Sequence, residues 1–266
     1  MYEEYWKLKL KPFENTPDPK FFYNSPQHEE GLTRMLYVIK EGKGAGLLTG
    51  VSGCGKTLLS RALMRELELD IYKVAIITNP RLDDIEMLRM ITHSLGTDVL
   101  PTGKADVLIA LEKMLINNLA DGKKTIVVVD EAHVIEDRNI FEEIRLLLNF
   151  QQDDKFLLSL ILIGQPELKE KVEAIKQLNQ RMAMRFHLEA LSANETSKYI
   201  NHRLRIAGAE KQVFLPDAIS VVQERSGGIP RKINQICDSA LLMGYGKGVD
   251  TIDSSIVKET IKSLSL

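Results

Sequence analysis

The stretch GLLTGVSGCGKTLLSRAL, residues 46–63, decides the expected fold. It contains the spacing Gly-x-x-x-x-Gly-Lys-Thr, with an apolar strand pattern before a glycine-rich loop and a helix pattern after it. Glycines let such a loop wrap tightly with its backbone N–H groups turned inward, and the helix N-terminus adds positive charge there. The stretch therefore predicts a phosphate-binding loop. The alternative is a chance glycine-rich turn before a helix.

The residues of this loop have distinct expected roles. Lys56 should reach the β- and γ-phosphates of ATP, and the hydroxyl of Thr57 should bind Mg²⁺. Cys54 occupies a variable position of the loop, and nothing in the pattern makes it a nucleophile. The nucleotide is expected to contact the residues Gly50, Val51, Ser52, Gly53, Cys54, Gly55, Lys56, Thr57 and Leu58.

Two carboxylates follow the apolar run TIVVV, residues 125–129. A buried strand that ends in Asp130 and Glu131 delivers both side chains to the carboxyl edge of a sheet, where the ligands of parallel sheets collect. We expect Asp130 to hold Mg²⁺ and contact the nucleotide, and Glu131 to orient and polarise an attacking water. An acidic pair suited to water favours hydrolysis over transfer to a second substrate. Alternatively, the pair only caps the next helix. His133 is expected to be structural.

Helix and strand patterns alternate around these motifs up to about residue 190. Apolar strands without alternation indicate a parallel sheet with helices on both faces. Beyond a capping box at Ser192-Ala-Asn-Glu195, only helix patterns follow. We predict an α/β core with a parallel five-stranded sheet and an N-terminal linker over residues 1–190, and a small all-α lid over residues 191–266. Strands are expected at residues 46–50, 72–78, 124–130, 156–164 and 185–191.

The composition is that of an ordinary soluble globular protein. Of the 266 residues, 44% are hydrophobic and 27% are charged, and the formal net charge is -2. This charge gives no general basic excess of the kind that indicates nucleic acid, although a local patch would not be visible in the total. Cys54 and Cys237 lack metal-ligand spacing, which suggests a reducing compartment. No signal-peptide pattern is present, and no apolar run reaches the ~18 residues of a membrane span.

Several stretches resemble the AAA+ superfamily and, within it, the ExeA/GspA type of secretion-pathway ATPase, which includes related MshM-type pilus-biogenesis proteins. The resemblance covers nearly the whole chain. The two nucleotide motifs are shared by P-loop ATPases in general, whereas the opening segment and GQPEL are more specific. The similar stretches are PFENTPDPKFFYNSPQHEEGL (residues 12–32), LLTGVSGCGKTLL, VVVDEAH, LILIGQPEL, LNQRMAMRFHLEALS and SGGIPRKINQICDSALL (residues 226–242).

The resemblance implies roles for three polar residues. Gln165 stands where AAA+ proteins place the first sensor, a polar side chain near the γ-phosphate and the water; otherwise it simply opens a loop. Asn79 stands where a polar residue can hold the catalytic glutamate away from water until a ligand binds; alternatively, it is a turn residue before Pro80. Arg231, in GIPRK, matches the second-sensor arginine that the lid carries to the γ-phosphate. Its alternative is a solvated helix arginine.

AAA+ proteins also project an arginine from the segment before the fifth strand into the ATP of a neighbouring subunit. A guanidinium suits this role because it is always charged and binds phosphate oxygens bidentately. Arg181 matches better by its distance to HLEAL, and Arg185 is the runner-up. Either could be an ordinary surface charge. The resemblance thus implies a homo-oligomer with ATP at the subunit interface.

The resemblance further implies a cytoplasmic Mg²⁺-dependent ATPase that couples ATP binding and hydrolysis to oligomerisation and to remodelling or assembly of a partner complex. The implied partner is a membrane-associated protein of a secretion or pilus apparatus. ExeA-type proteins typically continue into a transmembrane helix and a peptidoglycan-binding domain. This chain stops before them, so we expect either a truncated cytoplasmic fragment or a short relative, with any contact to the inner membrane made through a partner or a missing C-terminal segment. Two hypotheses compete: a DNA-associated AAA+ ATPase that regulates transposition, and a module that binds ATP without turnover.

Overall fold

The computed structural model describes residues 1–16, 18–68, 70–97, 102–153 and 155–264. Their contacts divide the chain into two compact units. The sheet unit comprises Gln27–Val51 and Leu59–Leu188, and the helical unit comprises Met1–Pro26, Ser52–Leu58 and Glu189–Leu266. This division differs from a single boundary at residue 190, because the N-terminal segment and the phosphate loop group with the C-terminal helices.

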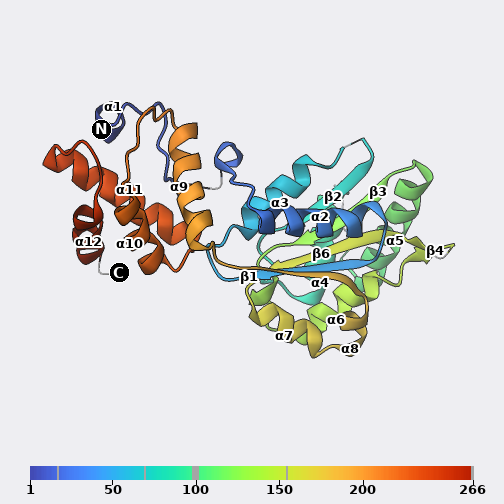
Figure 1. Ribbon diagram of the computed structural model, residues 1–266. Coiled ribbons are helices and arrows are strands. Elements are labelled where there is room, and N and C mark those ends of the chain that lie inside the picture. Colours follow the sequence, from blue (N-terminus) through green and yellow to red (C-terminus); the bar gives the residue numbers. More distant parts are fainter. Residues whose placement is uncertain (17, 69, 98–101, 154, 265–266) are drawn as a thin grey trace. The chain divides into compact units, whose positions relative to one another are not determined.

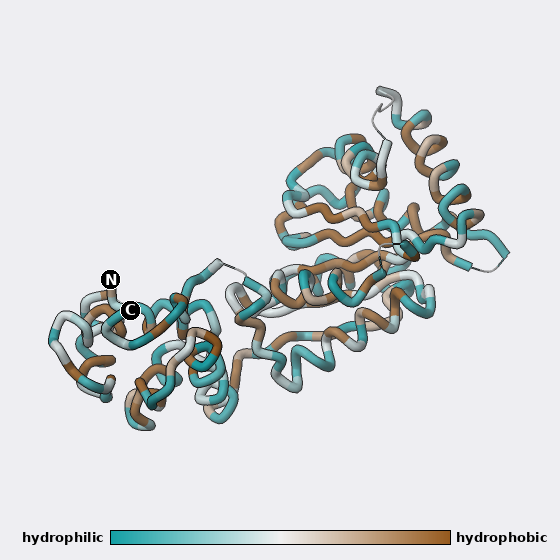
Figure 2. The backbone as a smooth tube through the Cα atoms, turned by 90° about the horizontal axis from the view of Figure 1, so that it is seen from above, coloured by the Kyte–Doolittle hydropathy of each residue, from teal (hydrophilic) through white to brown (hydrophobic). Residues whose placement is uncertain are grey.

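The sheet unit is built on a five-stranded parallel sheet with the strand order β2-β3-β6-β1-β7. The middle strands β1 and β6 are buried along their whole length, and the strands of this sheet appear largely brown in Figure 2. The predicted parallel α/β sheet is confirmed. The strands are β1 (Ala45–Gly50), β2 (Tyr72–Ile77), β3 (Lys124–Val129), β6 (Leu158–Gly164) and β7 (Met182–Leu188).

Helices cover both faces of this sheet (Figure 1). Successive side chains of a strand point to opposite faces. Leu47 and Val127 therefore pack on one face, while their neighbours Leu48 and Val128 pack on the other. The second face is covered by α2 (Pro26–Lys40) and α3 (Lys56–Arg65). The first face is covered by α4 (Asp84–Ser94), α5 (Lys104–Ala120), α6 (Arg138–Leu147), α7 (Glu167–Glu173) and α8 (Lys176–Gln180).

Two helix starts are fixed by capping boxes, and the sequence pattern predicts the one at Ser192. At α4, the carboxylate of Asp83 accepts a hydrogen bond from the N–H of Glu86 at 2.7 Å, and the Glu86 side chain accepts one from the N–H of Asp83 at 3.1 Å. The same reciprocal pair joins Ser192 and Glu195 at the start of α9 (Ala193–Ile206). Each box satisfies backbone donors that the first helical turn leaves unpaired.

The short elements of the sheet unit escape prediction from periodicity. They are a turn of 3₁₀ helix, η2 (Ala132–Val134), and a two-stranded hairpin, β4 (Gln151–Gln152) with β5 (Lys155–Phe156). Elements of two or three residues are too short for an apolar repeat to form, so only their surroundings decide them. Both lie beside candidate site residues.

The core of the helical unit combines the two ends of the chain. Tyr2, Trp6, Phe13 and Phe21 from the N-terminal segment are buried in one apolar cluster with residues of the C-terminal helices. The indole Nε1 of Trp6, for instance, donates to the carbonyl of Leu241 at 3.0 Å. The N-terminal segment is thus part of this unit's core. The elements are α1 (Tyr2–Tyr5), η1 (Pro19–Phe21), α9, α10 (Pro216–Ser226), α11 (Pro230–Lys247) and α12 (Ser254–Ser263).

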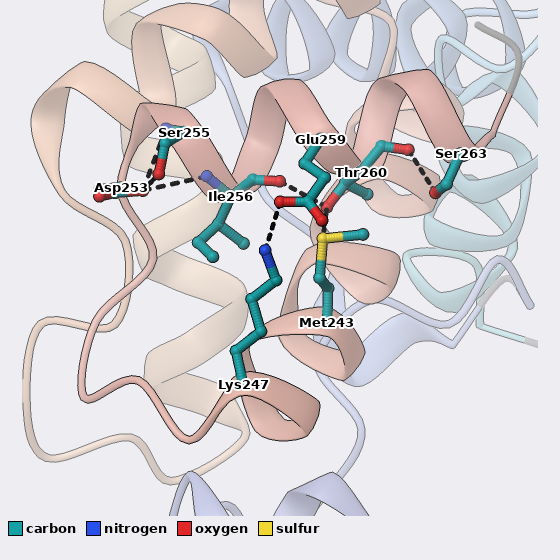
Figure 3. A network of polar contacts seen from close by, with 8 residues as sticks. All are labelled: Met243, Lys247, Asp253, Ser255, Ile256, Glu259, Thr260 and Ser263. Atoms are coloured by element: carbon teal, nitrogen blue, oxygen red, sulfur yellow. Dashed lines mark hydrogen bonds and ion pairs between the residues drawn. The ribbon is translucent and has the colours of Figure 1, made fainter.

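Polar contacts attach the last helix, α12, to α11 (Figure 3). The carboxylate of Asp253 accepts hydrogen bonds from the first turn of α12, which begins the helix. Lys247 forms an ion pair with Glu259 across the two helices, and the hydroxyl of Thr260 contacts the sulfur of Met243 at 3.5 Å. Because the ion pair is exposed to solvent, we attribute most of the attachment to apolar packing between the two helices.

The guanidinium of Arg203 holds the N-terminal segment against α9. Arg203 is only 5% exposed. Its Nε donates to the carbonyl of Pro12 at 2.5 Å and its Nη2 to that of Glu14 at 3.1 Å. Its Nη1 donates to the hydroxyl of Tyr199 at 2.7 Å, and the ring of Phe21 lies 4.9 Å from its Cζ. One buried cation therefore satisfies two backbone carbonyls of a segment that has little regular structure of its own.

We predict that Arg203→Leu lowers the free energy of unfolding by about 3 kcal/mol, because the carbonyls of Pro12 and Glu14 and the hydroxyl of Tyr199 lose a charged donor. Urea denaturation followed by circular dichroism measures this loss. The matched control is Arg205→Leu, an exposed arginine on the same helix, which should change stability by less than about 0.5 kcal/mol. Equal effects of the two variants would contradict the role given to Arg203.

Candidate nucleotide site

The glycine-rich loop joins β1 to α3 in a left-handed turn. The strand ends at Gly50 and the helix begins at Lys56. Between them Gly53 and Gly55 adopt φ values of +84° and +107°, which residues with a Cβ rarely adopt. Lys56 is 5% exposed, and Thr57 follows it in the first helical turn. The sequence thus folds locally as a phosphate-binding loop requires.

The first turn of α11 packs directly on this loop within the helical unit. The backbone N–H of Arg231 donates to the carbonyl of Gly53 at 3.2 Å. A Cβ placed on Gly53 would lie 2.7 Å from the Cβ of Arg231, so only glycine fits this approach. The side chain of Arg231, the candidate second sensor, is exposed and starts beside the loop.

Cys54 lies inside the loop with 1% of its surface exposed. Burial raises the pKa of its thiol, and the neighbouring Lys56 offsets this only in part. Since the thiolate is the reactive form of cysteine, a raised pKa makes this side chain a poor nucleophile at neutral pH. The residue therefore acts as a small apolar filler of the loop.

The two acidic residues after β3 differ in burial and in backbone conformation. Asp130 is 4% exposed, and its N–H continues the strand ladder by donating to the carbonyl of Ile77 at 2.9 Å. Its carboxylate accepts a hydrogen bond from the N–H of Glu131 at 2.8 Å. Glu131 has φ +54° and ψ 27°, a left-handed conformation that is uncommon for a residue other than glycine, and its side chain is 44% exposed. One carboxylate is enclosed and the other is open to solvent.

The side chains of Glu131, His133 and Gln165 meet at the carboxyl edge of the sheet. Because β3 pairs with β6, Glu131 and Gln165 leave neighbouring strands at the same edge. The amide Nε2 of Gln165 lies 2.8 Å from the imidazole Nε2 of His133, and that nitrogen lies 3.5 Å from Oε2 of Glu131. The sequence pattern did not predict this contact for His133, because it depends on the 3₁₀ turn η2. The only signal available was the spacing Asp-Glu-x-His itself.

Asn79 follows β2 at the same edge of the sheet, and its side chain is exposed. Within the part of the chain that the structure describes, Asn79 makes no hydrogen bond to Glu131. Among the described residues, the polar side chain next to the Glu131 carboxylate is that of His133.

Arg181 lies at the opposite, amino edge of the sheet, directly before β7. Its Nη1 donates to the carbonyl of Leu148 at 2.7 Å, its Nη2 to Oδ1 of Asn149 at 2.8 Å, and its Cζ lies 5.7 Å from the ring of Phe156. Arg185 sits within β7, where its Nη2 donates to the carbonyl and side chain of Asn179 at 2.6 and 2.7 Å.

The sheet itself separates Arg181 from the two acidic residues. A parallel strand of seven residues, such as β7 (Met182–Leu188), spans about 20 Å from its amino to its carboxyl end. A guanidinium at the amino edge therefore cannot reach Glu131 of its own chain. Asn149 and Phe156, which hold this arginine, were not identified from the sequence because they belong to the short segments after α6.

The available oxygen donors suit a nucleotide-bound Mg²⁺. The described residues contain no group of three or more His, Cys, Asp or Glu side chains arranged around a common point. Mg²⁺ bound with a nucleotide takes only one or two protein ligands and completes its shell with phosphate oxygens and water. The hydroxyl of Thr57 and the carboxylate of Asp130 are ligands of that kind.

The comparisons with known proteins agree with this architecture. The chain is 39% identical to General secretion pathway protein A of Aeromonas hydrophila over 255 residues, which cover 93% of this chain and 46% of that protein. The chain thus spans about half the length of this relative. Among solved structures, the Aeropyrum pernix ORC1 protein in complex with DNA aligns with a TM-score of 0.72 at 19% identity, over 96% of this chain and 69% of that one.

A second solved structure, the Aeropyrum pernix ORC2 protein in its ADPNP-ADP complexes, aligns with a TM-score of 0.67 at 19% identity, over 91% of this chain and 71% of that one. At such identities the likeness concerns the fold alone. Among the described residues, no helix has the length and apolar character needed to cross a membrane. The family model described as AAA domain matches residues 39–172, half of the chain. The chain therefore belongs to the AAA domain family.

Proposed function

We propose that this protein is a Mg²⁺-dependent ATPase that works as an oligomer. The observation that carries the proposal is the exposed carboxylate of Glu131 beside the buried Asp130 at the end of β3, in a chain whose glycine-rich loop leads into α3 at Lys56. A site for binding alone has no need of a solvent-accessible acid beside the metal ligand. Such an acid is what hydrolysis requires, because it can orient and polarise a water.

The residues divide the work of this reaction. Lys56 and the loop amides bind the phosphates, and Thr57 and Asp130 hold the metal, which when bound neutralises charge on the phosphates. Glu131 orients the attacking water, and Gln165 acts as first sensor. Arg231 binds the γ-phosphate and so couples nucleotide binding to the helical unit. Its backbone already contacts the loop at Gly53. For Asn79 we retain the proposed role of a switch that restrains Glu131 in another nucleotide state.

The position of Arg181 supports an oligomeric mechanism. An arginine at the amino edge of the sheet lies about 20 Å along the strand direction from the edge that carries the acids of its own chain, so an ATP site that it serves must belong to a neighbour. Its contacts with Leu148 and Asn149 keep the guanidinium in place in the isolated protomer. We retain Arg181 as the trans arginine in preference to Arg185, which lies within β7 and whose Nη2 bonds to Asn179.

The partner we propose is a membrane-associated protein of a secretion apparatus. The basis is the 39% identity to General secretion pathway protein A over most of this chain. Movements of the helical unit that accompany binding and hydrolysis would be passed to that partner. We place this action on the cytoplasmic side, where ATP is available.

Glu131→Gln should bind ATP as the unchanged protein does and hydrolyse it about 100-fold more slowly or worse, because an amide keeps the shape but cannot polarise water. Lys56→Ala should instead lose nucleotide binding, because it removes the charge that meets the phosphates. Calorimetry measures binding and phosphate release measures turnover. Unchanged turnover in Glu131→Gln would refute the assigned acid, and unchanged affinity in Lys56→Ala would refute the assigned loop.

Arg181→Ala should bind ATP almost normally and hydrolyse it on the order of 10³-fold more slowly, as expected for loss of a trans arginine. Mixing Arg181→Ala with Glu131→Gln protein should recover activity, because an intact Glu131 then meets an intact Arg181 across the interface. Arg185→Ala serves as the matched control. The shared site is disproved if mixing restores nothing and activity per subunit stays constant as protein concentration rises.

A DNA-associated ATPase is the second candidate, favoured by the likeness in fold to the ORC1 protein, which was solved in complex with DNA. That likeness is at 19% identity, and the net charge of this chain is -2. We therefore expect no sub-micromolar DNA binding at physiological salt, with or without ATP. Fluorescence anisotropy with duplex DNA checks this. Tight binding that weakens steeply with added salt would favour the second candidate.

A further inference from the structure

We propose that His133 is a positioning residue of the site, and that Gln165 acts on Glu131 through its imidazole. This inference rests on the proposed ATPase function and adds a member to its machinery. It assigns a task to a side chain that the sequence pattern marked only as structural.

The imidazole is the described link between the two other side chains. Its Nε2 lies 2.8 Å from the amide Nε2 of Gln165 and 3.5 Å from Oε2 of Glu131. Among the described residues, neither of those two side chains has another hydrogen-bond or ion-pair partner. Among the described residues, the hydrogen-bond and ion-pair route from Gln165 to Glu131 therefore passes through this ring.

The backbone that carries His133 is held from two sides. Nζ of Lys171, on α7, donates to the carbonyls of His133 and Ile135 at 2.5 and 2.7 Å, which fixes the turn η2. On the other side, a Cβ added to Gly164 would lie 3.1 Å from the backbone nitrogen of His133. The absence of a side chain at Gly164 lets the turn approach the end of β6. The imidazole is thus placed by the fold and is only 13% exposed.

The second ring nitrogen of His133 does not anchor the ring to any other described group. Nδ1 is buried and has no hydrogen-bond partner among the described residues. Buried polar atoms are nearly always paired, because leaving one unpaired costs about 1–3 kcal/mol. Here the single engaged nitrogen, Nε2, faces the two candidate catalytic side chains.

The orientation of the Gln165 amide decides how the ring acts on Glu131. When the amide N–H donates to Nε2, the ring proton is on Nδ1, and two acceptors, Nε2 and the Glu131 carboxylate, face each other. When the amide turns its oxygen to the ring, Nε2–H donates to that oxygen and also faces the carboxylate, which it attracts. One arrangement therefore releases Glu131 and the other holds it. A first sensor that turns its amide toward a bound phosphate would change this hold.

The test uses two amide replacements of different length. In His133→Gln the side-chain amide reaches the position of the imidazole Nε2, whereas in His133→Asn it reaches only that of Nδ1. We expect His133→Asn to lower kcat about 10- to 100-fold, the usual cost of losing a residue that orients a functional group, with unchanged KM and ATP affinity. His133→Gln should recover most of the loss. Urea denaturation of both variants monitors the fold.

A double-mutant cycle isolates the route through Glu131. On a Glu131→Gln background, His133→Asn should cause no further loss of kcat, because the ring acts only through that carboxylate. Gln165→Leu should likewise be non-additive with His133→Asn. Additive losses, or equal kcat values for His133→Gln, His133→Asn and the unchanged protein, overturn the proposal. If Glu131→Gln itself retains full turnover, the ATPase proposal fails and this inference fails with it. If only the His133 variants leave kcat unchanged, this inference fails and the ATPase proposal stands.

Discussion

The pairing of β3 with β6 is the constraint on which the candidate site depends. Parallel pairing brings the carboxyl ends of both strands to one edge, so Asp130 and Glu131 leave the sheet beside Gln165. Burial of both sheet faces holds this register, because each side chain is packed into one of two different cores. Val127 and Val128, which serve opposite cores, show how little freedom the strand has. The position of the acids is therefore a consequence of hydrophobic packing.

The same parallel order separates two chemical tasks. Residues that follow strands gather at one edge, and Arg181, which precedes a strand, belongs to the other. Under the proposed mechanism, a subunit offers its acids at one edge and its arginine at the opposite one. The site is then completed only when two subunits meet edge to edge, so the rate of ATP hydrolysis depends on oligomerisation. The hydrogen bonds of Arg181 to Leu148 and Asn149 orient its guanidinium in the protomer alone, without a neighbouring subunit.

The helical unit adds a different kind of coupling. The backbone of Arg231 is hydrogen-bonded to Gly53, so this end of α11 and the phosphate-binding loop form one packed body. Arg203 in turn ties the N-terminal segment to α9 through the carbonyls of Pro12 and Glu14. The first residues of the chain and its last helices therefore share one core. Any rearrangement of the loop on binding a nucleotide would act first on this unit.

The sequence by itself determined the elements with a long apolar repeat and the motifs with fixed spacing. These are the five strands, the main helices, the capping box at Ser192, and the loop that ends at Lys56. Such features depend on residues that are close in the chain, so they can be recognised from the amino-acid sequence. Tertiary structure alone decided that the N-terminal segment packs with the C-terminal helices, that Asn149 holds Arg181, and that His133 touches Gln165 and Glu131. These contacts join short or irregular segments distant in sequence, where no periodicity exists and only the packing of the whole chain selects the partner.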